Sequence, residues 1–121
     1  MLDKFSIGEK ATHMHHIFPK NEFKEIAEYI ENLIAITSGQ HLQKAHPNGN
    51  TQIVDKDYQY TCLLCKTESI RKNLVENKGE TVIYSFEDFM YVLNIGLRTE
   101  YFEHLIENDF NSVVTGIEFN Y

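Results

Sequence analysis

Apolar positions in the first third of the chain follow a strand pattern, then a helix pattern, then a strand pattern again. Residues 11–18 predict a short strand that ends at Pro19, because proline cannot donate a hydrogen bond to a β-ladder. A short amphipathic helix is predicted from Asn21, since the next apolar residues recur at helical spacing: Phe23, Ile26, Ala27 and Ile30. The apolar run 33–36 predicts a second strand, and Thr37-Ser38-Gly39 predicts the turn after it.

The segment that follows has room for only one more short element before the next turn. Gln40 to Ala45 can form about one and a half helical turns. His46 precedes Pro47, which disfavours helical geometry at His46, so this helix should end there.

The remaining two thirds of the chain read as mostly helical. A long helix is predicted from about Asp55 to Asn77, with Gly79 at the position that favours a helix C-terminus. Thr81–Tyr84 is rich in β-branched residues and predicts a strand. Ser85 and Asp88 resemble a capping box, which predicts a helix that carries Phe86, Phe89, Met90 and Leu93. A further helix is expected near Thr99, carrying Phe102, Leu105 and Ile106, and residues 112–121 allow no assignment.

Length and composition limit the class of protein. The chain of 121 residues is 42% hydrophobic, which predicts a single globular domain over residues 1–121 and excludes a disordered chain. No apolar run reaches the roughly 20 residues that a membrane helix needs. The first residues lack a basic stretch followed by an apolar core, and the chain has only two cysteines, so we expect a cytoplasmic location.

The net charge of −7 is unevenly distributed along the chain. Residues 1–78 hold ten basic and ten acidic side chains, whereas residues 79–121 hold only Arg98 against eight acids. A polyanion would be repelled by the acidic part, so any nucleic-acid contact is expected on the neutral part. Most basic residues of the predicted long helix are expected on a solvated face: Lys56, Lys66, Arg71, Lys72 and Lys78.

The histidines carry the chemical signal. Five of the six fall within 34 positions: His13, His15, His16, His41 and His46. Side chains alternate across a strand, so His15 and His16 point to opposite faces and cannot play the same part. One can bind a metal ion while its neighbour contacts a substrate.

The order of these residues resembles the HNH nucleases of the ββα-metal superfamily. The matching residues are His15-His16-Ile17-Phe18-Pro19, then Asn32-Leu33-Ile34-Ala35-Ile36, then Gln40-His41 with Ala45-His46-Pro47. His16 and Asn32 are 16 residues apart, and Asn32 and His41 are 9 apart. The match covers residues 11–47, and its residues are most similar to those of HNH-type restriction endonucleases. It implies an α+β fold, in which a strand–loop–strand–helix motif precedes a helical extension over residues 52–121.

The resemblance also implies roles for individual residues. By position His16 is the general base that activates water, and His15 and His41 are ligands of one divalent metal ion. Asn32 matches the asparagine that fastens the connecting loop and orients the base, which makes it the second catalytic residue. Lys20 and Lys44 flank the motif and are the expected substrate contacts.

The metal and the role of His46 stay open at this point. Relatives place a third ligand four residues after the first on the helix, whereas His46 follows His41 by five. Five residues turn an ideal helix by about 500°, so the two side chains would diverge unless Pro47 lets His46 turn back. His46 is therefore either a metal ligand or a phosphate contact. Imidazole ligands favour zinc, nickel or manganese, and magnesium remains possible.

Three functions remain in competition. The first is a metal-dependent DNA endonuclease of restriction or phage defence. The second keeps the nuclease site in a catalytic subunit of a larger defence complex, because a free-standing non-specific nuclease is expected to be basic. The third is a non-enzymatic module that a metal stabilises and that binds a protein partner. We also expect a homodimer or a partner protein to bind through residues 79–121, whose aromatic side chains look too numerous for one small domain to bury.

Overall fold

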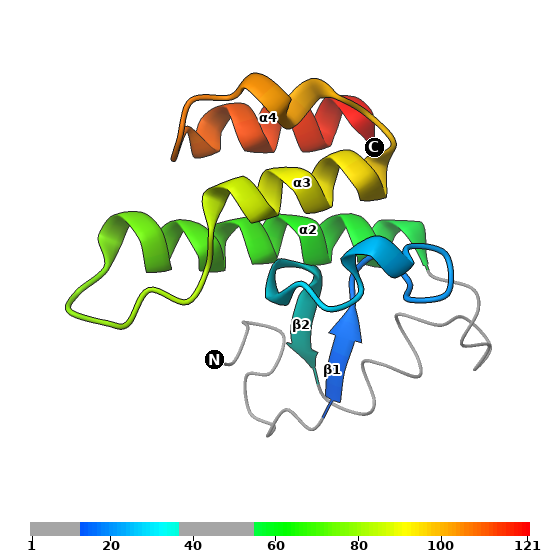
Figure 1. Cartoon of the computed structure of the whole chain (residues 1–121), viewed down its shortest axis with the longest axis horizontal. Coiled ribbons are helices and arrows are strands. Elements are labelled where there is room, and N and C mark those ends of the chain that lie inside the picture. Colours follow the sequence, from blue (N-terminus) through cyan, green and yellow to red (C-terminus); the bar gives the residue numbers. More distant parts are fainter. Residues whose placement is uncertain (1–12, 37–54) are drawn as a thin grey trace.

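The computed structural model describes residues 13–36 and 55–121, which form an α+β fold (Figure 1). This part consists of a two-stranded antiparallel sheet, β1 (His13–His16) and β2 (Leu33–Ile36), and three α-helices. The helices are α2 (Lys56–Arg71), α3 (Phe86–Leu97) and α4 (Phe110–Asn120). They lie side by side, and α2 separates the sheet from α4 in Figure 1. The predicted α+β class is therefore confirmed, while the helix predicted at 40–45 lies outside the described residues.

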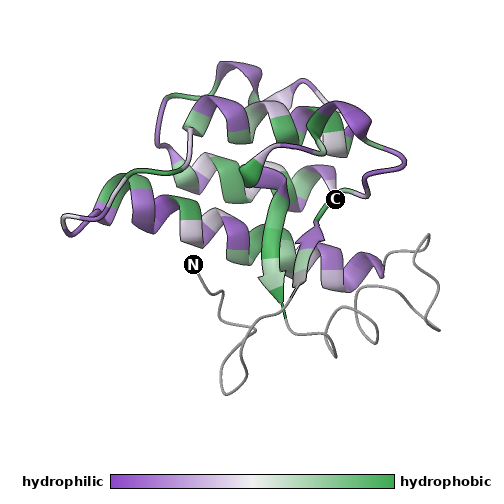
Figure 2. Ribbon diagram, turned by 60° about the horizontal axis from the view of Figure 1, so that its bottom comes forward, coloured by the Kyte–Doolittle hydropathy of each residue, from purple (hydrophilic) through white to green (hydrophobic). Residues whose placement is uncertain are grey.

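The two strands pair in a register that places the histidines opposite apolar residues. His15 pairs with Ile34, and His16 pairs with Leu33. The two strands differ in polarity, because β1 is rich in histidine and β2 is apolar (Figure 2). Ile34 and Ile36 are fully buried. Burial of β2 is what fixes the register, since a slip by one residue would turn its apolar side chains outward.

The segment between the strands does not form the helix that the apolar spacing predicts. It contains two short 3₁₀ turns instead, Lys24–Ile26 and Ile30–Asn32. The reason is that side chains occupy the carbonyl groups that an α-helix would need. The Ile26 carbonyl accepts from the side chain of Asn32 (3.3 Å), and the Ala27 carbonyl accepts from His16 (3.1 Å). Tertiary hydrogen bonds override the local preference here.

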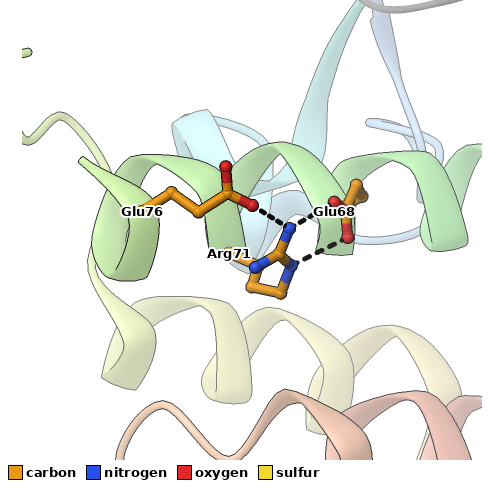
Figure 3. A network of polar contacts seen from close by, with 3 residues as sticks. All are labelled: Glu68, Arg71 and Glu76. Atoms are coloured by element: carbon orange, nitrogen blue, oxygen red, sulfur yellow. Dashed lines mark hydrogen bonds and ion pairs between the residues drawn. The ribbon is translucent and has the colours of Figure 1, made fainter. Parts of the chain in front are cut away.

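The long helix is confirmed, with a change of geometry at its end. Asp55 caps α2 by accepting from the Tyr58 amide at 2.9 Å. After Arg71 the chain continues as a π-helical turn, Lys72–Glu76. Arg71 joins the two parts, because its guanidinium contacts Glu68 on α2 (2.6 Å) and Glu76 on the turn (Figure 3). Gly79 follows with a φ of 80°, which glycine tolerates best.

The segment Thr81–Tyr84, predicted as a strand, has no regular secondary structure and pairs with no strand of the described part. The side chain of Asn73 forms hydrogen bonds with the backbone of this segment, where a strand would pair with a neighbouring strand. Asn73 donates to the Thr81 carbonyl at 2.9 Å and accepts from the Ile83 amide at 2.9 Å. A buried amide thus satisfies the groups that a neighbouring strand would otherwise pair.

The last two helices differ in how well the sequence predicts them. Ser85 caps α3 by accepting from the Asp88 amide at 3.1 Å, as the capping-box pattern predicts. The helix expected near Thr99 is only a 3₁₀ turn, Tyr101–His104, because Asn94 holds the Phe102 amide (3.0 Å) and Leu105 is extended. The unassigned tail is helix α4, which Asp109 caps at the Ser112 amide (3.2 Å). Phe110, Val113 and Ile117 form the buried side of this helix.

One core joins the sheet and all three helices. Most of the aromatic and methionine side chains of residues 79–121 that we expected to be left over for a partner are buried in it: Phe86, Phe89, Met90, Phe102 and Phe110. Four aromatic side chains of the same segment are exposed: Tyr91 (40%), Tyr101 (39%), Phe119 (82%) and Tyr121 (38%). The chain itself thus buries the first five of these side chains, and a dimer or partner contact through residues 79–121 stays a prediction. In the described ranges, no helix combines the length and the apolar character that crossing a membrane requires.

Candidate functional site

His16, the residue expected to act as a base, has a fixed ring orientation. It is the last residue of β1 and is half-buried. Its Nε2 lies 3.1 Å from the carbonyl oxygen of Ala27. A carbonyl can only accept a hydrogen bond, so Nε2 carries the hydrogen. In the neutral imidazole the lone pair is then on Nδ1, the atom that could take a proton from water.

Asn32 ties the ends of the segment between the strands together. It is fully buried immediately before β2. Its Oδ1 accepts from the Phe18 amide at 2.9 Å, and its Nδ2 donates to the carbonyls of Phe18 (3.1 Å) and Ile26 (3.3 Å). The same side chain therefore holds the exit from β1 and the turn just before Ala27. Because Ala27 is the partner of His16, Asn32 fixes both sides of that contact.

His15 is placed differently from its neighbour. Its side chain is buried, with 2% exposure, whereas His16 is half-buried. The two residues point to opposite faces of β1, as strand geometry requires. The prediction from strand alternation that the two side chains lie on opposite faces agrees with this difference in burial.

Several predicted site residues cannot be placed next to these. His41, Lys44 and His46 lie outside the described residues, and Lys20 lies on the surface after Pro19. Within residues 13–36 and 55–121, no three side chains of His, Cys, Asp or Glu come together as a group that could hold a metal ion. Of the metal ligands that the sequence predicts, only His15 lies in the described part. The other two, His41 and His46, fall in residues 37–54.

The helical part contributes a residue that sequence reasoning missed. Gln59 of α2 donates from Nε2 to the Ile17 carbonyl at 2.7 Å, next to His16 in the chain. Gln59 and Lys66 both lie on the buried side of α2, with exposures of 4% and 2%. Their spacing from Cys62, Leu63 and Ile70 was the available signal, because a polar residue on a core-facing stripe needs a partner.

The expectation that Lys66 lies on a solvated helix face is wrong. Its ammonium group donates to the hydroxyl of Tyr84 at 2.8 Å and lies 4.5 Å from the centre of that ring. Lys66 therefore fastens the segment 81–84 to α2.

Cys62 is buried on the same helix and Cys65 is half-buried, and both are free of disulfides.

Comparisons of the chain with protein-family models, with curated proteins and with solved structures found no match. Any class of protein must therefore be argued from the residues and from the geometry above.

Proposed function

We propose that the chain is a metal-dependent endonuclease of the HNH type that hydrolyses phosphodiester bonds in DNA, in restriction or phage defence. The observation that carries the proposal is the fixed orientation of the His16 imidazole. Its Nε2 is bound to the Ala27 carbonyl, and Asn32 holds the backbone on both sides of this contact. The order of His15, His16, Asn32 and His41 in the sequence adds the family resemblance.

The arrangement supports general base catalysis for a physical reason. Hydrolysis of a phosphodiester needs a group that takes a proton from water, and an imidazole does this only with its unprotonated nitrogen. The Ala27 carbonyl selects the tautomer in which Nδ1 is that nitrogen. The buried amide of Asn32 binds the Ile26 carbonyl, one residue before Ala27, and both backbone groups of Phe18, so the backbone on either side of the ring is held before the reaction.

The proposal also includes a site for one divalent metal ion. His15 and His41 would hold it, and His46 is either a third ligand or a phosphate contact. When bound, a divalent ion supplies positive charge for the phosphate and the departing oxygen. The donor chemistry of His15 fits zinc, nickel or manganese better than magnesium.

The test is incubation of the purified protein with plasmid DNA in the presence of zinc, nickel, manganese or magnesium. Cleavage with at least one ion, and loss of cleavage on chelation, is the expected result. Labelled ends should carry 5′-phosphate and 3′-hydroxyl groups, as the resemblance implies. Intact plasmid under all four ions, or 3′-phosphate ends, would count against the proposal.

The variant His16→Ala separates the base from the metal site. We expect cleavage to fall at least about 100-fold, the usual contribution of a general base, while metal content and folding stay close to wild type. His104→Ala is the matched control, because the His104 side chain is 90% exposed at the end of a 3₁₀ turn. Loss of metal from His16→Ala to the same extent as from His15→Ala would make His16 a ligand instead.

The charge distribution favours a second candidate, in which this chain is the catalytic part of a larger defence assembly. Residues 79–121 carry eight acidic side chains and one basic side chain, which disfavours tracking along DNA. Sedimentation together with a cleavage assay distinguishes the two. A monomer that cuts both strands alone supports the first candidate, and a chain that cuts only with an added partner supports the second.

A further inference from the structure

The backbone that follows His16 is held by a residue from the helical part of the chain. Gln59 is 42 positions further along the sequence, and its Nε2 donates to the Ile17 carbonyl at 2.7 Å. The Ile17 amide donates to the carbonyl of Asn32 at 2.8 Å. Both polar backbone groups of Ile17 are thus bound, the amide by the segment between the strands and the carbonyl by α2.

Tyr121 holds the other end of the Gln59 carboxamide. The Tyr121 hydroxyl lies 2.5 Å from Gln59 Oε1 and 2.7 Å from the Lys56 carbonyl. A hydroxyl has one hydrogen and both neighbours are acceptors, so the hydrogen is shared between them. The Ile17 carbonyl can only accept, so Nε2 must face Ile17, and Oε1 then faces the Tyr121 hydroxyl. A carboxamide turned the other way would place its oxygen against the Ile17 carbonyl, and two acceptors repel each other.

We propose that Gln59, held at its Oε1 by Tyr121, is a positioning residue for the His16 base. This inference rests on the function proposed above. The contact between His16 and Ala27 measures 3.1 Å, near the upper end of ordinary N–H···O distances. A shift of a few tenths of an ångström at Ile17 would therefore weaken it and release the ring. Gln59 prevents this shift, and its helix, α2, contains none of the predicted site residues.

The first experiment measures the His16 ring directly and does not need activity. Nitrogen-15 NMR of the imidazoles, at a pH where they are neutral, distinguishes the Nε2–H tautomer from the Nδ1–H tautomer. We expect the Nε2–H form to predominate in wild type and a mixture of both forms in Gln59→Met. Tyr121→Phe should shift the population in the same direction by a smaller amount. Thr67→Val is the matched control, because it removes a buried hydrogen bond from the same helix at a distance from Ile17.

The second experiment measures steady-state cleavage of plasmid DNA with the ion that supports activity best. Misplacing a catalytic group by a fraction of an ångström lowers the chemical step, so we expect kcat to fall about tenfold in Gln59→Met. KM for DNA and the metal content should stay within about twofold, and Thr67→Val should match wild type. This split separates positioning from general destabilisation, which would lower the folded fraction and leave the tautomer of the folded molecules unchanged.

The outcomes separate the two proposals. If wild type cleaves DNA while Gln59→Met keeps both the wild-type tautomer and the wild-type kcat, the positioning role is wrong and the nuclease proposal stands. If wild type cleaves nothing, the nuclease proposal fails, and the NMR experiment still decides whether Gln59 orients the ring. Should Gln59→Met not fold, Tyr121→Phe decides the inference, because it removes only a hydroxyl from a residue that is 38% exposed.

Discussion

Asn32 binds both backbone polar groups of Phe18: the Phe18 amide donates to Oδ1 at 2.9 Å, and Nδ2 donates to the Phe18 carbonyl at 3.1 Å. A side-chain amide that pairs with a backbone peptide in this way reproduces one step of a β-ladder. It lets the chain leave β1 without exposing the two groups to an apolar interior. The cost of removing it is therefore predictable.

Replacing Asn32 by alanine should strongly destabilise the fold. The substitution leaves the amide and the carbonyl of buried Phe18 without their partner, and the Ile26 carbonyl keeps only the Tyr29 amide. Each such group costs about 1–3 kcal/mol, and partial relaxation leaves an expected loss of about 2–4 kcal/mol in the free energy of unfolding. Urea unfolding followed by circular dichroism measures it.

Two further variants show whether the amide chemistry is responsible. Asn32→Asp should be at least as destabilising, because it sets a carboxylate oxygen against the carbonyls of Phe18 and Ile26. Asn94→Ala removes one half-buried contact, to the Phe102 amide at 3.0 Å, and should cost only about 1 kcal/mol. Equal losses for Asn32→Ala and Asn94→Ala would contradict a special role for Asn32.

Gly96→Ala should destabilise the chain, although the same change in an exposed helix is normally favourable. A Cβ on Gly96 would lie 2.3 Å from ring atoms of Phe18. Phe18 is 1% exposed and cannot move into solvent without losing its packing. We expect a net loss of about 1–3 kcal/mol, the usual cost of overpacking.

Coupling between the two positions tests the cause. The double variant Phe18→Leu with Gly96→Ala should lose less stability than the sum of the single variants, because the smaller side chain makes room. Strict additivity would mean that the loss arises from α3 itself and not from the contact.

Tyr121 should make the stability of the fold fall at alkaline pH. Burial, and then the nearby Cys62, Asp55 and Asp57, raise its pKa above the ordinary value of 10.0. The folded state therefore holds this proton more tightly than the unfolded state does. Its contribution is complete below the unfolded pKa and is lost as pH rises through the raised one. Unfolding free energies measured from about pH 8 to about pH 11.5 should decline more steeply in wild type than in Tyr121→Phe. Parallel curves would show that the hydroxyl does not titrate with folding.

His15, together with His41 and His46 outside the described ranges, gives a graded prediction on metal binding. His15→Ala and His41→Ala should each lower metal affinity by about tenfold or more, because a direct ligand is lost. If the ion is zinc, X-ray absorption should show nitrogen ligands at about 2.0–2.1 Å. His46→Ala should lower metal affinity if His46 is a ligand, and should weaken DNA binding alone if it contacts phosphate. Unchanged affinity in His15→Ala and His41→Ala would refute the site.

Much of the fold could be predicted from local patterns. The apolar run 33–36 was correctly read as a strand, and the Ser85 cap correctly marked the start of α3. Helix α4 was missed although Asp109 and the spacing of Phe110, Val113 and Ile117 carry the usual signals. The opposite faces of His15 and His16 also follow from strand alternation alone.

The sequence alone therefore determined the features that depend on neighbouring residues: the helix caps, the alternation of side chains along β1, and the order of the candidate site residues. Only the tertiary structure decided the contacts that join distant segments. Residues 21–30 have helical spacing, yet they form turns because His16 and Asn32 take the carbonyls of Ala27 and Ile26. Gln59 reaches Ile17 across 42 residues, and Lys66 is buried against Tyr84. Such contacts stabilise a buried polar group only when the whole chain has folded around it, and no local pattern contains that information.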